Sequence, residues 1–294
     1  MQSKGFAERR VCQLVGLARS SLRYQPSPAR ADEQQIQQSL LAFAQNPRKR
    51  RRGYRLVHAE LQRELAKEGK PLNAKRIRRL WREAGLCIPP RRRKKTLRTG
   101  RSATDLVASE PNAVWCLDFL EEKTLHHQKL RILCVSDEFT REVLALTVGT
   151  HFISERVVAT LEKLTGQRVA PGALRMDNGP EFIALALRGF CHRESINPAY
   201  IDPGKPWQNG YAEGFHSRLR DEFLDGEQFH GVRDGQVGMD GWRRYFNEER
   251  LHSSLGYRTP AEFAASWEAS KEERNPALAA EPPSSPAAGP PADL

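Results

Sequence analysis

The sequence predicts an α/β fold in which a mixed five-stranded sheet is flanked by helices and preceded by an all-α region of the helix-turn-helix type. Three observations lead to this prediction. Apolar residues follow a helical period in the first third of the chain. Five short apolar runs come after residue 110, and segments with a helical period separate the later runs. With 294 residues, the chain is long enough for two domains with separate cores.

Charge divides the chain in the same way. Residues 1–101 contain 27 Lys and Arg against 7 Asp and Glu, whereas residues 102–294 contain 20 basic and 29 acidic residues. We expect the first third to bind a nucleic acid, because Lys and Arg that neutralise phosphates release counterions. A solvated surface or a membrane-facing patch is the alternative. The bases lie inside helical patterns and not in one tail, which favours nucleic acid.

Helices are expected at about 7–24 and at 54–66, and a further helix should follow the N-cap residue Asn73 and stop at Gly85. This last helix has one apolar stripe, and most of its other positions are basic. A short basic helix after a tight turn is typical of a helix-turn-helix that lies on DNA. Lys75, Arg76 and Arg79 are therefore candidate DNA contacts. A basic helical hairpin that binds nothing specific remains the alternative.

Composition gives the expected domain boundaries. Residues 1–87 form the helical DNA-binding region, 88–110 a basic linker that begins with two prolines and five basic residues, and 111–270 the α/β region with its C-terminal helix. The basic run at 48–52 is expected to be an exposed loop. Residues 271–294 are rich in Pro and Ala with almost no large apolar side chain, which predicts a disordered tail.

Cysteine usage and hydropathy indicate the compartment. The five cysteines are widely spread without a C-x-x-C pair, which argues against a disulfide framework or a structural zinc site. No apolar run approaches the 18 residues that a membrane span needs, and the N-terminus has no signal-like apolar segment. We therefore expect a cytoplasmic protein that does not bind a membrane.

The α/β region is expected to contain strands at 114–119, 130–135, 143–148, 173–176 and 198–201. The first three lie close together and should pair as an antiparallel meander. A helix around 157–164 leads to the fourth strand, another at about 182–191 leads to the fifth, and a long helix begins near Asn209. On this long helix, Tyr211, Phe215, Leu219 and Phe223 recur every four residues and should face the core.

Three acidic residues are candidate metal ligands. Asp118 lies in an apolar strand, where a carboxylate needs a partner or a metal ion. Asp177 follows the fourth strand, and Glu213 lies near the start of the long helix. Each also has a structural interpretation: a solvent-facing edge position for Asp118, a tight turn for Asp177 and a favourable helix dipole for Glu213. Together, two acids at strand ends and one on a nearby helix can supply the oxygen ligands that Mg²⁺ prefers.

The segments around these acids resemble the three catalytic segments of DDE-type insertion-sequence transposases and retroviral integrases. They read WCLDF at 115–119, DNGPEF at 177–182 and PGKPWQNG at 203–210, and 35 residues separate Asp177 from Glu213. Downstream, YFN at 245–247, Arg250 and HSSLGYRTP at 252–260 are similar to the C-terminal signature of the group. The N-terminal helices resemble those of the second-reading-frame (OrfB) product of such elements. Departures such as His216 and Leu251 remove none of the three acids.

The resemblance implies a ribonuclease H-like integrase catalytic core in which Asp118, Asp177 and Glu213 are catalytic and hold two Mg²⁺ ions, with Mn²⁺ as an alternative ion. It implies double-stranded DNA as partner, both as element ends and as target. Assembly as a homo-oligomer on DNA is implied as well, with or without fusion to an upstream-frame product, in the nucleoid of a bacterial cytoplasm. Further candidate DNA contacts lie on the long helix and in the loop before it: Lys205, Asn209, His216 and Arg220.

Three functions remain open from the sequence. The first is a transposase that cleaves DNA strands and transfers them, in transposition, integration and recombination, by metal-assisted phosphoryl transfer. The second is a nuclease on the same fold. The third is a DNA-binding protein that does not transpose, or a relic of an element. The retained acids favour the first.

Overall fold

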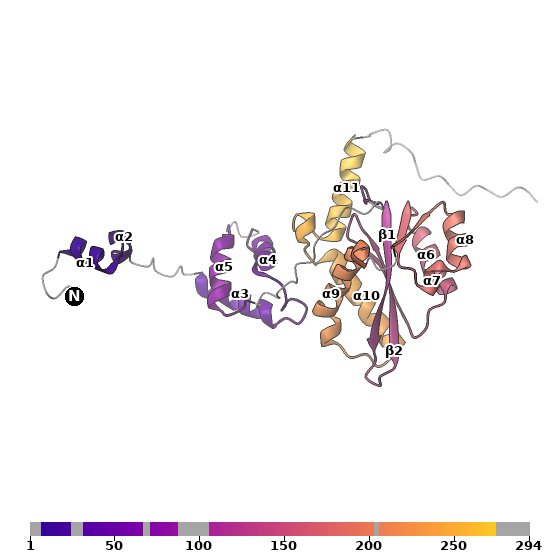
Figure 1. Ribbon diagram of the computed structural model, residues 1–294, viewed down its shortest axis with the longest axis horizontal. Coiled ribbons are helices and arrows are strands. Elements are labelled where there is room, and N and C mark those ends of the chain that lie inside the picture. Colours follow the sequence, from indigo (N-terminus) through magenta and orange to yellow (C-terminus); the bar gives the residue numbers. More distant parts are fainter. Residues whose placement is uncertain (1–6, 25–31, 67–70, 88–105, 203–205, 275–294) are drawn as a thin grey trace, which may run out of the picture. The chain divides into compact units, whose positions relative to one another are not determined.

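The computed structural model describes residues 7–24, 32–66, 71–87, 106–202 and 206–274 (Figure 1). Lys205, most of the expected linker and nearly all of the expected tail lie outside these residues. The chain separates into two units, residues 1–42 and 43–294.

The first unit contains α1 (Glu8–Val15) and α2 (Arg19–Leu22), both within the helical region expected at about 7–24. The break occurs at Gly16, whose φ of 66° is the left-handed conformation that glycine adopts readily at a helix C-terminus. An ion pair between Arg23 and Glu8, 2.8 Å long, joins the two helices. The sequence analysis missed α3 (Glu33–Gln45), which begins in this unit.

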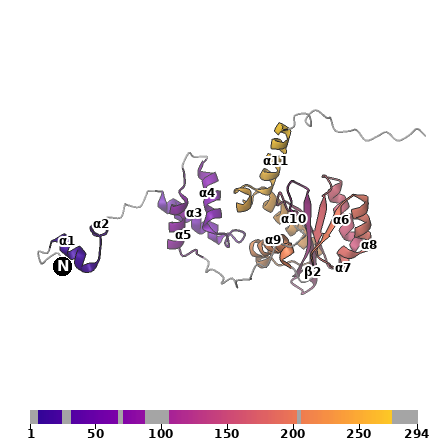
Figure 2. The ribbon, with the colours of Figure 1, turned by 45° about the horizontal axis from the view of Figure 1, so that its top comes forward.

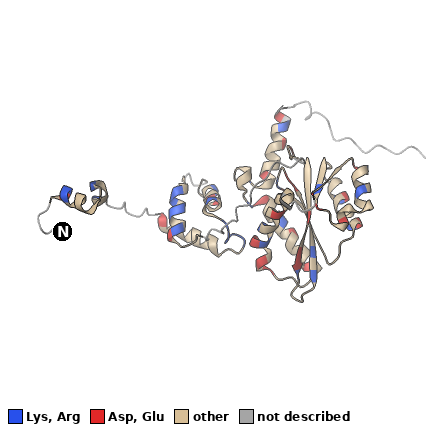
Figure 3. Cartoon of the chain, viewed as in Figure 1, with Lys and Arg blue, Asp and Glu red and all other residues tan. Residues whose placement is uncertain are grey.

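The second unit begins with the end of α3 and continues into α4 (Tyr54–Ala66) and α5 (Ala74–Glu83), as predicted. The Asn73 side chain accepts a hydrogen bond from the Lys75 amide at 2.8 Å, so the predicted N-cap is confirmed. Leu72, in the turn before it, is held by the side chains of His58 and Gln62. The apolar stripe of α5 is buried through Ile77, Leu80 and Trp81, and Lys and Arg occupy most of its other positions (Figure 3).

The five strands have the order β3-β2-β1-β4-β5. They are β1 (Val114–Lys123), β2 (Lys129–Asp137), β3 (Val143–Gly149), β4 (Ala173–Met176) and β5 (Asn197–Tyr200). The predicted antiparallel meander of the first three is confirmed, and β4 and β5 are parallel to β1. This mixed five-stranded sheet is ribonuclease H-like, as predicted.

Helices cover both faces of the sheet (Figures 1 and 2). One face packs on α6 (Ser154–Thr165), α7 (Pro180–Ile183) and α8 (Leu185–Arg193), and the other on α9 (Gly210–Glu222) and α10 (Val232–Glu248). The strands separate two cores because their side chains alternate: Leu133 and Val135 enter the first core, and Ile132 and Cys134 the second. The last described helix, α11 (Pro260–Arg274), packs on α10.

Two side-chain amides of α10 occupy the outer edge of β3. Asn247 accepts a hydrogen bond from the Val143 amide and donates one to its carbonyl, both at 2.9 Å. Gln236 accepts from Val148 N and donates to Leu146 O, both at 2.8 Å. These amides satisfy backbone groups that an edge strand otherwise exposes for pairing with another chain. This gives Asn247, part of the C-terminal signature, a structural role.

The expectation of an exposed loop at 48–52 is wrong for Arg52. This residue is 5% exposed, and its guanidinium contacts Glu60, Glu222 and Tyr245. A buried arginine is tolerated here because carboxylates and a hydroxyl accept its hydrogen bonds. No helix in the described part of the chain is long and apolar enough to cross a membrane.

Candidate catalytic site

Asp118 lies on β1, and Asp177 directly follows β4, the neighbouring strand parallel to β1. The pairs Val114–Ala173 and Cys116–Arg175 fix the register of β1 and β4, and the same offset places Asp118 opposite Asp177, directly after β4. Neighbouring strands are about 4.8 Å apart. Alternation along both strands directs the two carboxylates to the face of the sheet that α9 covers.

Glu213 reaches this place from α9. Asn209, the N-cap residue of α9, donates a hydrogen bond from Nδ2 to Asp118 Oδ2 at 3.1 Å, and His216 Nδ1 lies 3.8 Å from the same oxygen. Further along, Arg220 donates to the Glu121 carbonyl at 2.8 Å. Residues 209, 213, 216 and 220 form one helical stripe, which we call the carboxylate stripe because it faces β1. Glu213 therefore lies between two residues that contact Asp118.

The surroundings of Asp118 disfavour its charge. Burial raises the pKa of Asp118 from 3.8 to about 6; the hydrogen bond from the Phe119 amide opposes this shift, and the charges of Asp177 and Glu213 add to it. The carboxylates of Asp177 and Glu213 are thus close enough to act on Asp118. Burial and the nearby charge of Arg220 lower the pKa of His216 to about 4. A neutral His216 beside Asp118 does not compensate the negative charge of the site.

The turn after β4 orients Asp177. Its Oδ1 accepts a hydrogen bond from the Gly179 amide at 2.9 Å, and Asn178 donates to the Ile201 carbonyl at 2.7 Å. A Cβ at Gly179 would lie 2.9 Å from that same Oδ1, so a side chain here would displace the carboxylate. Glu181, the other acid of this segment, is paired with Arg131. The turn thus leaves Asp177 as the acid of this segment that faces the carboxylate stripe.

The residues fit a divalent cation in their chemistry. Three carboxylates are hard oxygen donors of the kind that Mg²⁺ takes, and mutual repulsion at a partly buried Asp118 is relieved by a cation. In the conformation described, Asp118 uses Oδ1 to accept from Phe119 N and Oδ2 to accept from Asn209. Accordingly, no three His, Cys, Asp or Glu side chains among the described residues are already arranged to hold one ion.

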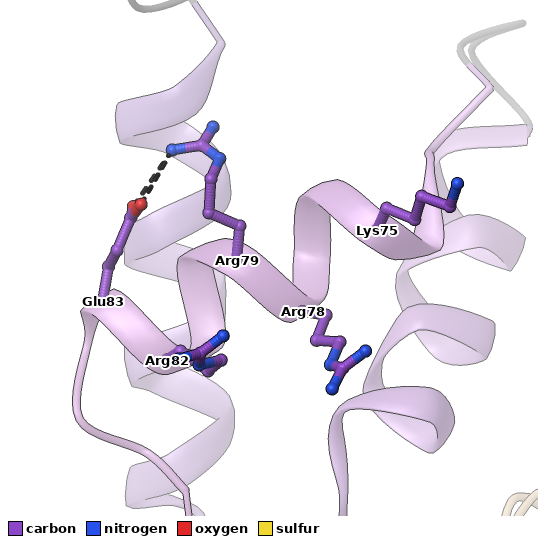
Figure 4. Close-up of a pocket in the computed structure, with 5 residues that line it drawn as sticks. All are labelled: Lys75, Arg78, Arg79, Arg82 and Glu83. Atoms are coloured by element: carbon purple, nitrogen blue, oxygen red, sulfur yellow. Dashed lines mark hydrogen bonds and ion pairs between the residues drawn. The ribbon is translucent and has the colours of Figure 1, made fainter. Parts of the chain in front are cut away.

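The candidate DNA contacts fall into two groups. Lys75 and Arg79 are exposed on α5, and Arg76 is half-buried. There a hollow of about 640 Å³ is lined by Lys75, Arg78, Arg79, Arg82 and Glu83, and Arg79 pairs with Glu83 at 3.1 Å (Figure 4). Arg78 and Arg82, spaced four residues apart on the same helix, are additional basic residues of this surface.

The second group lies on α9 and at its N-cap. Its side chains were expected to contact DNA, but in the structure Asn209 and Arg220 contact residues of β1. Asn209 is only 4% exposed and is bonded to Asp118 and Cys116, so it lies against the carboxylate and not on the surface. Arg220 is exposed and contacts Glu121 and Glu122 of β1. Lys205 lies outside the described residues. The sequence placed His216 and Arg220 on the helix and Asn209 in the loop before it, but could not show that these residues face β1.

Comparisons with known proteins agree with this architecture. A family model described as an integrase core domain matches residues 108–206, a second model of the same description matches 194–260, and an HTH-like domain model matches 30–94. An insertion element IS407 protein of 31.7 kDa from Burkholderia multivorans is 38% identical over 268 residues, which are 91% of this chain and 94% of that protein. Transposase InsD of insertion element IS2 from Escherichia coli is 29% identical over 226 residues, 72% of either chain.

Among solved structures, the HTLV-2 integrase catalytic core domain in complex with magnesium is similar with a TM-score of 0.41 and 16% identity, covering 54% of this chain and 99% of that one. An integrase core joined to an HTH-like region defines the class of protein. The chain belongs to the family of insertion-element transposases with this core. The resemblance seen in the sequence is thereby confirmed, and membership associates the chain with DNA transposition and integration.

Proposed function

We propose that the chain is a transposase that cleaves DNA strands at the ends of an insertion element and joins them to target DNA, with Asp118, Asp177 and Glu213 as catalytic metal ligands. The register that sets Asp118 opposite Asp177, beneath a helix stripe carrying Glu213, is the observation that supports this best. Family membership supports the reaction type.

In this mechanism the three carboxylates hold two divalent ions, Mg²⁺ or Mn²⁺. When bound, such ions supply Lewis-acid stabilisation of the phosphoryl group and activation of the attacking oxygen. The chain contributes positioning: Asn209 fixes the orientation of Asp118, and the turn at Gly179 fixes that of Asp177. Water attacks first to free a 3′-hydroxyl, which then attacks a second phosphodiester, so that no covalent enzyme intermediate is needed.

The basic surface of α5 holds the element end by its phosphates, through Lys75, Arg78, Arg79 and Arg82. Joining two ends to one target requires more than one active site, so we propose a homo-oligomer on double-stranded DNA in the bacterial cytoplasm, at the nucleoid. A fusion with an upstream-frame product is compatible with this arrangement. On this proposal, neutralising Lys75 and Arg79 weakens binding and flattens its salt dependence by about 0.9 per lost phosphate contact.

The test uses the full chain and oligonucleotides that carry the ends of the element. Asp118→Asn, Asp177→Asn and Glu213→Gln should each abolish cleavage and joining and leave end binding intact, because only the metal-dependent step is lost. Glu194→Gln, at an exposed acid after α8, is the matched control and should react like the wild type. Near wild-type joining by any of the three variants would remove that residue from the proposed ligand set.

A second substrate separates the transposase from a nuclease on the same fold. DNA with a precut 3′ end needs no hydrolysis, so a transposase should join it to target DNA, whereas a nuclease should leave it unjoined. A chain that binds ends but neither cuts nor joins with Mg²⁺ or Mn²⁺ would be a DNA-binding protein or a relic.

A further inference from the structure

A second polar hollow, which the proposed chemistry does not use, lies beside the start of α9. Its volume is about 340 Å³, and it is lined among others by Arg141, Gly210, Gly214, Arg218, His252 and Ser254. Arg141 comes from the β2–β3 turn, and His252 and Ser254 come from the C-terminal signature segment. Three segments far apart in sequence thus build one site. We call it the Arg141–Arg218 pocket.

No carboxylate is among the described residues that line the pocket, although the charges of Glu138 and Glu222 act on Arg141 and Arg218 from outside it. Arg141 stacks on the Tyr211 ring, with 4.7 Å between the guanidinium carbon and the ring centroid. Arg218 donates to the Gly214 carbonyl at 2.9 Å. Within the described part of the chain, neither guanidinium forms an ion pair with an acid. Arg250 does not line the pocket, and its charge is neutralised by the ion pair with Glu222.

The pKa of the buried His252 reflects the same positive charge of the surrounding arginines. His252 is 7% exposed, and burial together with the positive charges of Arg250, Arg218, Arg141 and Arg52 lowers its pKa to about 2. An uncharged imidazole therefore forms part of the wall, and the arginines supply the charge. A guanidinium presents several N–H donors in a planar fork that matches phosphate oxygens.

At the floor of the pocket, the backbone of α9 is accessible to a ligand because Gly210 and Gly214 carry no side chain. A Cβ built on Gly210 meets no atom within 4 Å, and one on Gly214 would come to 3.4 Å from Arg218 Nη1. Two glycines one helical turn apart leave the backbone of α9 open to a ligand. Ser254, which is exposed, adds a hydroxyl at the rim.

The position of the pocket relative to the carboxylates follows from the helix. At about 100° per residue, positions 210, 214 and 218 lie roughly 130° around α9 from the carboxylate stripe at 209, 213, 216 and 220. The pocket therefore occupies a different side of the same helix, which with its side chains measures about 10–12 Å across. A DNA strand that reaches the carboxylates and crosses α9 passes this flank.

We infer that the Arg141–Arg218 pocket binds a backbone phosphate of the DNA strand, a few nucleotides from the phosphate that reacts at the carboxylates. This inference rests on the proposed function, because it takes the same DNA as ligand. A phosphodiester suits the pocket since it is anionic, accepts from both guanidinium groups and leaves its bases outside. The pocket would hold the strand in place while the reacting phosphate is positioned.

The experiment measures binding of the full chain, in metal-free buffer, to element-end oligonucleotides in which single phosphates are replaced by neutral methylphosphonates. For the wild type, one replacement near the reacting phosphate should weaken binding about tenfold. Arg218→Ala should bind the unmodified DNA about tenfold more weakly and become insensitive to that replacement. Its salt dependence should flatten by about 0.9, the value for one lost phosphate contact. Arg141→Ala should behave similarly, and Arg218→Lys should recover part of the affinity.

Arg188→Ala, at an exposed arginine of α8 that does not line the pocket, is the matched control and should keep the full interference pattern. Thermal unfolding of each variant separates loss of contact from loss of fold. Unchanged affinity and interference in both Arg141→Ala and Arg218→Ala would overturn the inference. So would a change only in the oligomeric state, which would indicate an acidic side chain of a second copy as occupant. Pocket-dependent binding without any cleavage by the wild type would overturn the proposed function alone.

Discussion

Glu222 forms buried ion pairs with Arg52 and Arg250, so we predict that removing its charge destabilises the fold. Glu222, on the last turn of α9, is 6% exposed. Arg250 donates to it twice, from Nε at 2.7 Å and from Nη2 at 2.5 Å, and Arg52 Nη2 lies 3.5 Å away. Glu222→Gln removes the carboxylate between two arginines whose side chains are only 3% and 8% exposed.

The expected loss follows from leaving a buried cation without its partner. Breaking a buried ion pair on one side costs about 3–5 kcal/mol. We expect the lower end, about 3 kcal/mol, because glutamine keeps one acceptor oxygen, Arg52 keeps Glu60, and Arg250 also donates to the Leu251 carbonyl. For a core of this size that corresponds to roughly 6–12 °C in the unfolding midpoint.

Urea unfolding followed by tryptophan fluorescence measures the loss. Glu162→Gln is the matched control, since Glu162 pairs with Arg193 at 3.0 Å but both side chains are more than half exposed, 52% and 59%. That variant should change stability by less than about 0.5 kcal/mol. The double variant Glu222→Gln with Arg250→Met should be more stable than Glu222→Gln alone, because it removes the uncompensated charge. A loss below about 1 kcal/mol, or a double variant less stable than the single one, would refute the reasoning.

Three further predictions concern single residues. The pKa of Asp118 is raised from 3.8 to about 6, so ionising it costs stability as pH rises from about 4 to 6. Asp118→Asn should therefore stabilise the metal-free chain by up to about 3 kcal/mol at pH 7.5 and by little at pH 4; equal urea midpoints at pH 7.5 would contradict this. Asn73→Ala should cost about 1 kcal/mol in thermal unfolding of the helical region, and Asn73→Ser should restore it. Asn247→Ala leaves both backbone groups of Val143 unpaired, so hydrogen exchange at that amide should accelerate at least tenfold; unchanged protection would argue against edge capping.

The features that the sequence predicted correctly are those set by local patterns. Strand segments were recognisable because their apolar residues are buried on both faces, and β4 has the predicted bounds. Asn73 was recognisable because an N-cap depends on a side chain and the amide two residues on. Asp118 stood out because a carboxylate inside such a strand needs compensation. The register that sets Asp118 opposite Asp177 depends on pairing between distant strands, which periodicity does not encode.

The features that the sequence missed depend on contacts between distant segments. Arg52 belongs to a run of five basic residues, and only the fold places Glu222 and Tyr245 around this one. Asn209 is a polar residue in a loop motif, and only the packing of α9 on β1 buries it against Asp118. For α3, the signal was present in Ile36, Leu40 and Phe43, spaced four and three residues apart, but Ser and Gln between them weakened the pattern.

Helix α9 contributes to the hydrophobic core, to the carboxylate site and to the Arg141–Arg218 pocket. One stripe, through Phe215 and Leu219, is buried in the core, and the neighbouring carboxylate stripe faces β1. The third flank carries Gly210 and Gly214, although each glycine weakens a helix by about 1 kcal/mol relative to alanine. Packing of the buried stripe and the anchoring of Glu222 by Arg250 offset that weakness at the other end of the helix. If the open flank exists to admit a phosphate, Gly210→Ala should stabilise the helix and yet weaken DNA binding, whereas a flank without a ligand should show the gain in stability alone.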